Sequence, residues 1–325
     1  MGLLIEGKWS TEWYETNLSN GEFIRQDAQF RHQVGEGRLI AEEGRYHLFV
    51  SLACPWAHRA LIFRKLKNLE KMINVSVVRA EMLDGGWEID DGMSVSLGYQ
   101  VSPIEKIKFL HEVYCSAKSD YTGRVTVPVL WDKKTSTIVN NESSEIIRIL
   151  NSAFDEFSDM KTDFYPRHLR SQIDEINNPI YDDINNGVYR AGFATTQEAY
   201  EKSYHQLFKS LDFLEDRLAR QRYLVGNHIT EADWRLFTTL IRFDMVYYSH
   251  FKTNKRRIED FPNLSNYVRE LYQYDGISET VNFEHIKTHY YYSHETINPT
   301  RVIPAGPEID FDRPHNRAAI GKQAR

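Results

Sequence analysis

The sequence has only two cysteines, Cys54 and Cys115, among its 325 residues. Two cysteines cannot build the disulfide framework that stabilises small secreted domains, and such sparse use is typical of a reducing compartment. Long apolar runs are also missing, because no stretch approaches the roughly 18 to 20 residues of a membrane-spanning helix. The first ten residues likewise lack the apolar core of a secretory signal. We therefore expect a cytoplasmic protein that does not enter a membrane.

An excess of positive charge is absent as well. The 40 lysines and arginines stand against 46 aspartates and glutamates, which gives a net charge of −6. No uniform positive field is available to hold a nucleic-acid backbone or an anionic membrane surface. A small molecule or another protein is therefore the expected partner. With 41% apolar and 26% charged residues the composition is that of a globular protein, and the length suggests two domains of roughly 100 to 200 residues each.

The apolar residues divide the chain into four parts. Residues 1–45 show no sustained helix or strand period, which predicts an irregular arm that packs through its aromatic side chains. Residues 46–154 follow the order β-α-β-α-β-β-α, which indicates one sheet covered by helices, an α/β domain. Residues 165–297 carry only helical patterns and should form an all-α bundle. Residues 298–325 are rich in proline and glycine and should be a poorly packed tail.

The same patterns place the individual elements. Strands are expected at 46–51, 73–82, 127–132 and 137–141, and a loop at 84–102. Helices are expected at 55–69, 103–118, 143–154, 167–186, 195–220, 229–251, 264–274 and 281–291. Thr230 and Asp233 have the spacing of an N-terminal cap for the helix at 229–251, and we interpret them as structural.

Cys54 lies between an expected strand and an expected helix, and Pro55 fits the first helical turn, where a missing N–H costs nothing. The sulfur should therefore face backbone N–H groups that have no partner inside the helix. Those donors and the positive helix end favour thiolate over thiol, and such settings lower a cysteine pKa from about 8.5 to roughly 3.5–7.5. Cys54 is the candidate nucleophile, with a buried structural cysteine as the ordinary alternative. Cys115, inside an amphipathic helix, is expected to be inert packing.

A second thiol beside Cys54 is missing. A dithiol redox motif would place cysteine at position 57, where this sequence has alanine, so an adduct on Cys54 has no neighbour to resolve it. The second thiol must come from solution, and in a cytosol the abundant candidate is glutathione. The sequence therefore predicts a monothiol exchange cycle with glutathione as co-substrate.

Two short segments could hold glutathione. The proline after Val127 leaves an unpaired edge, to which the peptide part of glutathione could add as an extra strand. In a thioredoxin-like domain the Val127–Pro128 bond would be cis and lie beside the cysteine. Glu142 and Ser143, at the start of a helix, offer a carboxylate for an amino group and N–H donors for a carboxylate, as a γ-glutamyl end requires. Taken alone, ordinary helix capping is the more frequent explanation of that pair.

Six motifs together resemble one protein family. They are SLACPWAHR, GGW at 85–87, GRVTVPVLWD, NNESSEI, NNGVYRAGFA and HYYYSHETINP. Their combination resembles the glutathionyl-hydroquinone reductases, the omega-like or xi class of glutathione transferases, and the resemblance runs from the arm to the tail. It implies a thioredoxin-like N-terminal domain, an all-helical C-terminal domain and a homodimer.

The resemblance also implies residue roles and an activity. Cys54 matches the nucleophile, Tyr189 the proton donor or acceptor, and Tyr247 and Tyr290 match tyrosines that help to hold the thiolate. The positions that match glutathione-binding residues are Trp87, Arg124, Val125, Thr126, Val127, Glu142 and Ser143. The implied enzyme reduces S-glutathionyl-hydroquinones to hydroquinones through a Cys54–glutathione disulfide and releases oxidised glutathione. Phenolic groups suit this chemistry, because they can stabilise the charge that develops on a ring oxygen and move its proton.

Other interpretations remain open at this stage. A general omega-type thiol transferase, acting on mixed disulfides or dehydroascorbate, would share the Cys54 chemistry without needing the tyrosines. A non-catalytic carrier of aromatic ligands is a third candidate. His285, His289 and His294 have a spacing that could present imidazoles to a metal, but without a neighbouring glutamate motif or cysteine we expect no metal.

Overall fold

The computed structural model describes residues 2–12 and 14–320. Their contacts form two compact units. Unit 1 contains residues 2–12, 25–162 and 280–295, and unit 2 contains residues 14–24, 163–279 and 296–320. Residues 280–295, which the sequence-based division places with the helical part, thus belong to unit 1 because their side chains contact its loops.

Unit 1 is built on a four-stranded sheet in the order β4-β3-β6-β7. Its strands are β3 (Tyr46–Val50), β4 (Asn74–Val77), β6 (Val129–Asp132) and β7 (Thr137–Asn140). β3 pairs in parallel with β4 and antiparallel with β6, and β6 pairs antiparallel with β7. Every residue of β3 is buried, including His47, so this strand is covered on both faces and shows no alternation of buried and exposed residues.

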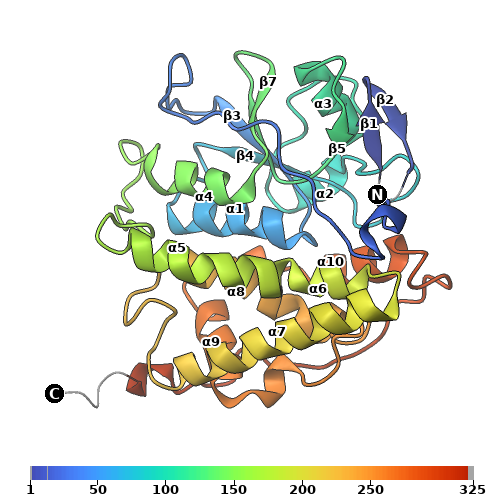
Figure 1. Cartoon of the computed structure of the whole chain (residues 1–325). Helices are drawn as coiled ribbons and strands as arrows, with labels where there is room; N and C mark the ends of the chain where they lie inside the picture. Colours follow the sequence, from blue (N-terminus) through green and yellow to red (C-terminus); the bar gives the residue numbers. More distant parts are fainter. Residues whose placement is uncertain (1, 13, 321–325) are drawn as a thin grey trace. The chain divides into compact units, whose positions relative to one another are not determined.

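The strand directions gather three segments at one edge of this sheet. β3 and β7 run the same way, because each is antiparallel to β6. The helices that follow them, α1 (Pro55–Leu66) and α4 (Ser143–Ser152), therefore begin at the same edge, and they pack against each other (Figure 1). The segment that enters β6 lies at this edge as well. Cys54, residues 125–127 and the start of α4 are thus brought together by topology alone.

Two expectations about the N-terminal arm and the 84–102 loop are wrong. The arm is not wholly irregular, because β1 (Leu3–Ile5) and β2 (Lys8–Ser10) form a second sheet with β5 (Gly123–Arg124), in the order β2-β1-β5. The loop contains a helix, α2 (Asp91–Ser96), whose first turn is capped by Asp90. Elements of three to six residues are too short to show a hydrophobic period.

The helix expected at 103–118 is shorter than its apolar pattern. It begins at Leu110 as α3 (Leu110–Ala117). The carboxylate of Glu112 accepts the backbone N–H groups of Lys108 and Phe109, both at 2.7 Å. This one-sided cap by the Glu112 carboxylate fixes the start of the helix, and the preceding residues are left in an irregular segment.

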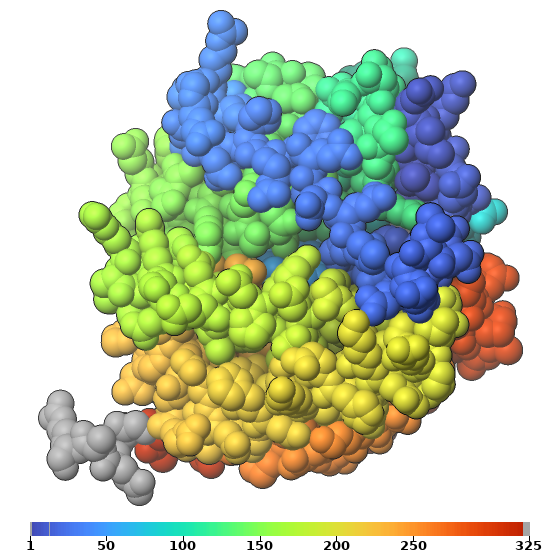
Figure 2. All heavy atoms as spheres, viewed as in Figure 1, coloured from blue at the N-terminus to red at the C-terminus, as the bar shows by residue number. Residues whose placement is uncertain are grey.

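Unit 2 is helical throughout its regular part. Its longer elements are α5 (Arg170–Pro179), α6 (Gly187–Gly192), α7 (Gln197–Leu218), α8 (Glu231–Arg242) and α9 (Pro262–Tyr272). Two π-helical turns, η2 (Ile180–Asn185) and η3 (Phe243–Tyr247), extend α5 and α8. α8 is buried along its whole length and begins with the expected capping box of Thr230 and Asp233. Many side chains of α7, coloured yellow, reach the surface (Figure 2).

Short 3-10 turns and one further helix complete the chain. They are η1 (Asn17–Ser19), η4 (Ile258–Asp260), η5 (Ser278–Thr280), η6 (Arg317–Ala319) and α10 (Phe283–Ser293). Part of the expected loose tail is well packed: Arg317 is fully buried and donates hydrogen bonds of 2.7 Å to the carbonyls of Leu218 and Gln221. Residues 321–325 of that tail lie outside the described residues. Within the described chain, no helix combines the length and apolarity needed to cross a membrane.

Candidate active site

Cys54 is the N-terminal cap residue of α1, as its sequence position predicts. Its backbone is extended, with φ −76° and ψ 122°, and Pro55 is the first helical residue. The backbone carbonyl of Cys54 accepts the N–H of His58 at 2.9 Å, and its own N–H donates to Ser51 at 3.2 Å. The half-buried thiol thus stands at the end of the helix where N–H groups are unpaired by intrahelical bonds.

Cys115 occupies a different environment. It lies in α3 with its Sγ atom 3.5 Å from the carbonyl oxygen of Gly7. Burial, together with the Glu112 carboxylate, raises the pKa of the Cys115 thiol. This thiol is therefore protonated at neutral pH and is a poor nucleophile, which agrees with its interpretation as packing.

The segment that enters β6 lies beside Cys54. The Sγ atom of Cys54 is 3.7 Å from the carbonyl oxygen of Val127, and the Val127–Pro128 peptide bond is cis, as expected for a thioredoxin-like domain. The hydroxyl of Tyr114 donates to the Thr126 carbonyl at 2.8 Å and so fixes the neighbouring peptide. Among the described residues, the backbone N–H of Val127 has no hydrogen-bond partner. An extended peptide laid alongside would find a donor and an acceptor there.

Glu142 and Ser143 form the start of α4. One carboxylate oxygen of Glu142 accepts the backbone N–H and the hydroxyl of Ser144, both at 2.9 Å, so the side chain caps the helix. The expected capping is therefore present. Within the described chain the N–H of Ser143 has no acceptor, and the second oxygen of Glu142 has no donor. These two atoms remain available to an amino-acid end group.

Arg59 ties the two helix starts together, and the sequence interpretation missed it. Its guanidinium donates to the Ser143 hydroxyl at 3.3 Å and lies 4.5 Å from the centre of the Trp56 ring. The guanidinium of Arg25 lies 5.0 Å from the same ring. Arg59 is only 1% exposed. Its place in the SLACPWAHR motif was the available signal, but the motif does not show what a buried arginine contacts.

Trp87 and Arg124 lie in other loops and strands of unit 1. Trp87 is 6% exposed, its carbonyl accepts the N–H of Leu110 at 2.8 Å, and its ring stacks on His289 of α10. Arg124 lies in β5 and donates to the carbonyl of Glu12 at 2.7 Å. Val125, between Arg124 and Thr126, is buried at 2% exposure.

The predicted catalytic tyrosines fall in two places. Tyr189 in α6 and Tyr247 in η3 are both in unit 2, where their ring centres are 5.9 Å apart and each packs on Phe251. Both are buried, at 7% and 0% exposure. Tyr290 lies in α10 of unit 1, 2% exposed, with its ring against His294 at 5.4 Å. Tyr189 and Tyr247 are thus neighbours within unit 2. Tyr290 belongs to unit 1, which also contains Cys54.

His289 of α10 and His294, just after this helix, pack against each other. His289 and His294 meet edge to face with ring centres 5.6 Å apart, and the Nδ1 atom of His289 lies 2.9 Å from the Ala80 carbonyl oxygen. Over the residues that the structure covers, no three histidine, cysteine, aspartate or glutamate side chains converge as metal ligands would.

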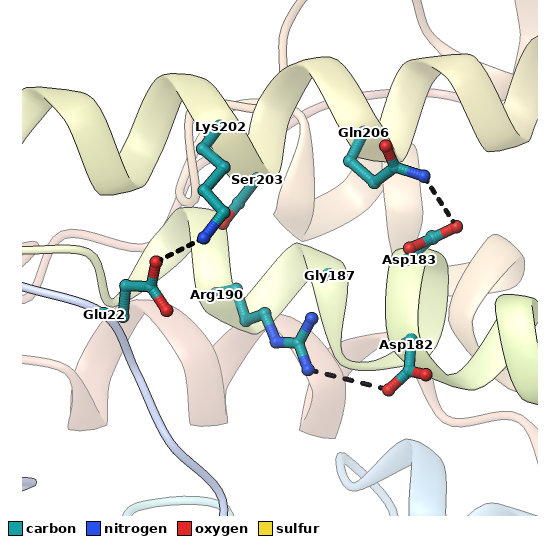
Figure 3. Close-up of a pocket in the computed structure, with 8 residues that line it drawn as sticks. All are labelled: Glu22, Asp182, Asp183, Gly187, Arg190, Lys202, Ser203 and Gln206. Atoms are coloured by element: carbon teal, nitrogen blue, oxygen red, sulfur yellow. Dashed lines mark hydrogen bonds and ion pairs between the residues drawn. The ribbon is translucent and has the colours of Figure 1, made fainter. Parts of the chain in front are cut away.

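A separate polar cavity of about 160 Å³ lies in unit 2 (Figure 3). It is lined by Glu22, Asp182, Asp183, Gly187, Arg190, Lys202, Ser203 and Gln206. Its charged groups pair with one another: Lys202 with Glu22 at 2.7 Å and Arg190 with Asp182 at 3.6 Å, while Gln206 donates to Asp183 at 2.9 Å (Figure 3). None of the predicted site residues lines it.

Comparisons with known proteins identify the family. The models "Glutathione S-transferase, N-terminal domain" and "Glutathione S-transferase, C-terminal domain" match residues 53–153 and 197–270. The glutathionyl-hydroquinone reductase YqjG of Escherichia coli is 53% identical over 326 residues, which cover 98% of each chain. The glutathionyl-hydroquinone reductase PcpF of Sphingobium chlorophenolicum is 52% identical and covers 94% of this chain and 96% of its own.

Solved structures agree with this assignment. Glutathione-bound YqjG has a TM-score of 0.85 at 51% identity, covering 98% of this chain and 99% of its own. The xi-class glutathione transferase of Natrialba magadii has a TM-score of 0.90 at 46% identity, covering 98% and 97%. The expected thioredoxin-like and all-helical domains are confirmed. The chain belongs to the glutathione transferase superfamily and, within it, to the xi-class family of glutathionyl-hydroquinone reductases.

Proposed function

We propose that this protein uses glutathione to reduce S-glutathionyl-hydroquinones to hydroquinones, with Cys54 as the nucleophile. The observation that carries the proposal is the setting of Cys54: a half-buried thiol at the N-terminus of α1, beside the free edge at Val127. Position 57 is alanine, so no second thiol follows Cys54 in the first turn of the helix. The thiol of Cys115 contacts the carbonyl oxygen of Gly7. Relatives that are about half identical over nearly the whole chain carry the name of this activity.

Glutathione would bind along the edge of the sheet where α1, α4 and β6 begin. Its cysteinyl backbone would pair with the N–H and the carbonyl of Val127, which places its sulfur next to Cys54. The α-carboxylate of its γ-glutamyl end would accept the N–H of Ser143, and its amino group would meet Glu142. Trp87 and the segment of Arg124, Val125 and Thr126 would contact the rest of the tripeptide.

The first half of the cycle breaks a carbon–sulfur bond. The Cys54 thiolate attacks the sulfur of the glutathionylated ring in its keto tautomer, and the Cys54–glutathione disulfide forms. The electron pair of the broken bond passes into the ring and ends on a ring oxygen, so no aryl carbanion is formed. That phenolate takes a proton, and Tyr189 is the proposed donor, with Tyr247 and Tyr290 as further hydrogen-bond donors.

The second half restores the thiolate. The thiolate of a second glutathione attacks the glutathionyl sulfur of the disulfide, and Cys54 leaves as thiolate. One glutathionyl-hydroquinone and one glutathione thus give one hydroquinone and one oxidised glutathione. The thiols supply the two electrons that reduce the ring, so no metal or other redox cofactor is required.

The family also suggests where and how the protein works. We propose a homodimer in the cytoplasm, on the basis of the xi-class resemblance and the sparse cysteines. Light scattering on the purified protein tests the homodimer, and a mass equal to one chain at micromolar concentration contradicts it.

A mass measurement tests the cysteine assignment directly. The protein is mixed with a glutathionyl-hydroquinone in the absence of free glutathione. We expect one glutathionyl group on Cys54 with release of one hydroquinone, and the same result for the Cys115→Ser control. No adduct, or an adduct on Cys115, contradicts the proposal.

A further inference from the structure

The ring of His289 covers one face of Trp87. The two ring centres are 4.8 Å apart and the planes are inclined by 23°, which is a stacked arrangement. Both side chains are more than nine-tenths buried, at 5% and 6% exposure. Stacked aromatic pairs of this kind contribute beyond their buried area. The indole is thus supported by a residue of α10 that lies far from it in the sequence.

His289 is itself held in one orientation. Its Nδ1 atom lies 2.9 Å from the carbonyl oxygen of Ala80, so Nδ1 carries the hydrogen and donates it. One turn later on the same helix face, Ser293 accepts the N–H of Met82 at 2.9 Å. α10 therefore holds the segment Ala80–Met82, which leads into the turn before Trp87, at two points.

The turn before Trp87 depends on the glycine at position 86. Gly86 has φ +75° and donates its N–H to the carbonyl of Leu83 at 2.8 Å. A Cβ atom on Gly86 would lie 2.7 Å from the ring of Trp9, so the turn accepts only glycine there. Within the described chain the indole N–H of Trp87 has no hydrogen-bond partner. It is available to a ligand acceptor.

We infer that His289 is a positioning residue for glutathione: it fixes the indole of Trp87 in the orientation in which Trp87 contacts the tripeptide. The inference rests on the proposed function, which places Trp87 at the glutathione site. Tyr290 is the next residue on the same helix. α10 would therefore position both the Trp87 contact with glutathione and the phenol of Tyr290. Loss of the His289 ring should then weaken glutathione binding and raise its KM, with kcat changed much less.

Glutathione affinity in a non-reacting background tests this inference. In the Cys54→Ser protein, titration calorimetry gives the Kd of reduced glutathione for the further variants His289→Ala, His289→Phe and His289→Gln. Phenylalanine keeps the stack without the hydrogen bond to Ala80, whereas glutamine keeps a donor without the ring. We expect Kd to rise up to about tenfold for alanine and glutamine, the size of an aromatic pair, and to return to within about twofold for phenylalanine.

Controls separate this inference from the proposed function. Thr288→Ala, on the same turn of α10, should leave Kd unchanged, and the near-ultraviolet circular dichroism of the tryptophans should change for His289→Ala but not for His289→Phe. If Trp87→Ala raises Kd while all three His289 variants bind like the parent, the inference is overturned and the proposed function stands. If Trp87→Ala also binds like the parent, the glutathione assignment of Trp87 is wrong and the inference falls with it.

Discussion

Replacing Arg59 by methionine should weaken both the fold and the glutathione site. The guanidinium is 1% exposed, donates to the hydroxyl of Ser143 at 3.3 Å and stacks on Trp56 at 4.5 Å. A hydrogen bond from a charged donor contributes about 1.5–3 kcal/mol, and a cation–π contact about 1 kcal/mol at a partly buried site. Methionine restores much of the packing volume but neither interaction. We expect the free energy of unfolding to fall by about 2.5–4 kcal/mol.

The same change should reach the site through Ser143. Its hydroxyl loses the donor that fixes it at the start of α4, so the proposed pocket for the γ-glutamyl end should be less well ordered and KM for glutathione should rise several-fold. Urea unfolding measures the first effect, and steady-state kinetics at saturating glutathionyl-hydroquinone measures the second. Arg38→Met is the matched control, since Arg38 is exposed and forms no hydrogen bond, ion pair or ring contact with described residues. If Arg59→Met is no more destabilising than Arg38→Met, the reasoning is refuted.

Three further outcomes follow from the structure. Tyr189→Phe should slow hydroquinone release at least tenfold while leaving exchange with a simple glutathione disulfide nearly unchanged, and equal losses on both substrates would favour a general thiol transferase. Iodoacetamide at pH 7 should modify Cys54 long before Cys115, because burial raises the pKa of the Cys115 thiol; peptide mapping measures the order. Burial, with smaller effects from nearby cations, lowers the pKa of His47 to about 3. Because the unfolded chain takes up this proton near pH 6.5, the unfolding free energy should fall as pH drops from about 6.5 to 3, by at most about 1.4 kcal/mol per pH unit. His47→Gln should flatten that decline, and an unchanged slope contradicts the assignment.

Local rules were enough to place the two helix starts at which Cys54 and Glu142 lie. A short apolar strand followed by Cys54 and Pro55 predicts a helix N-terminus, and the structure has Cys54 as the cap residue of α1. The same holds for Glu142 at α4. These features depend on residues adjacent in the sequence, where backbone geometry and capping chemistry decide the outcome.

Contacts between distant segments could not be read in this way. The bond from Arg59 to Ser143 spans 84 residues, and the stack of Trp87 on His289 joins the first half of the chain to α10. The sequence pattern shows neither contact, because an arginine or a histidine at these positions could equally well be exposed on the surface. The π-helical turn at Ile180–Asn185 was not predicted, for a different reason. One extra residue in a turn shifts the apolar face without interrupting it, so the 167–186 pattern looks like a continuous helix.

The alanine at position 57 decides how an adduct on Cys54 is resolved. A cysteine there would attack the Cys54–glutathione disulfide from within the same helix turn, at an effective concentration that tethering raises to millimolar or above. The product would be an internal disulfide, and the enzyme would need a separate reductant to return to its thiolate form. Alanine removes that route, and Cys115 does not supply another because its thiol is held against Gly7 with a raised pKa. In the proposed cycle the mixed disulfide is then opened by a thiol from solution. Because the glutathionyl group on Cys54 still occupies the edge beside Val127 at that point, the second glutathione must reach the disulfide without using that edge.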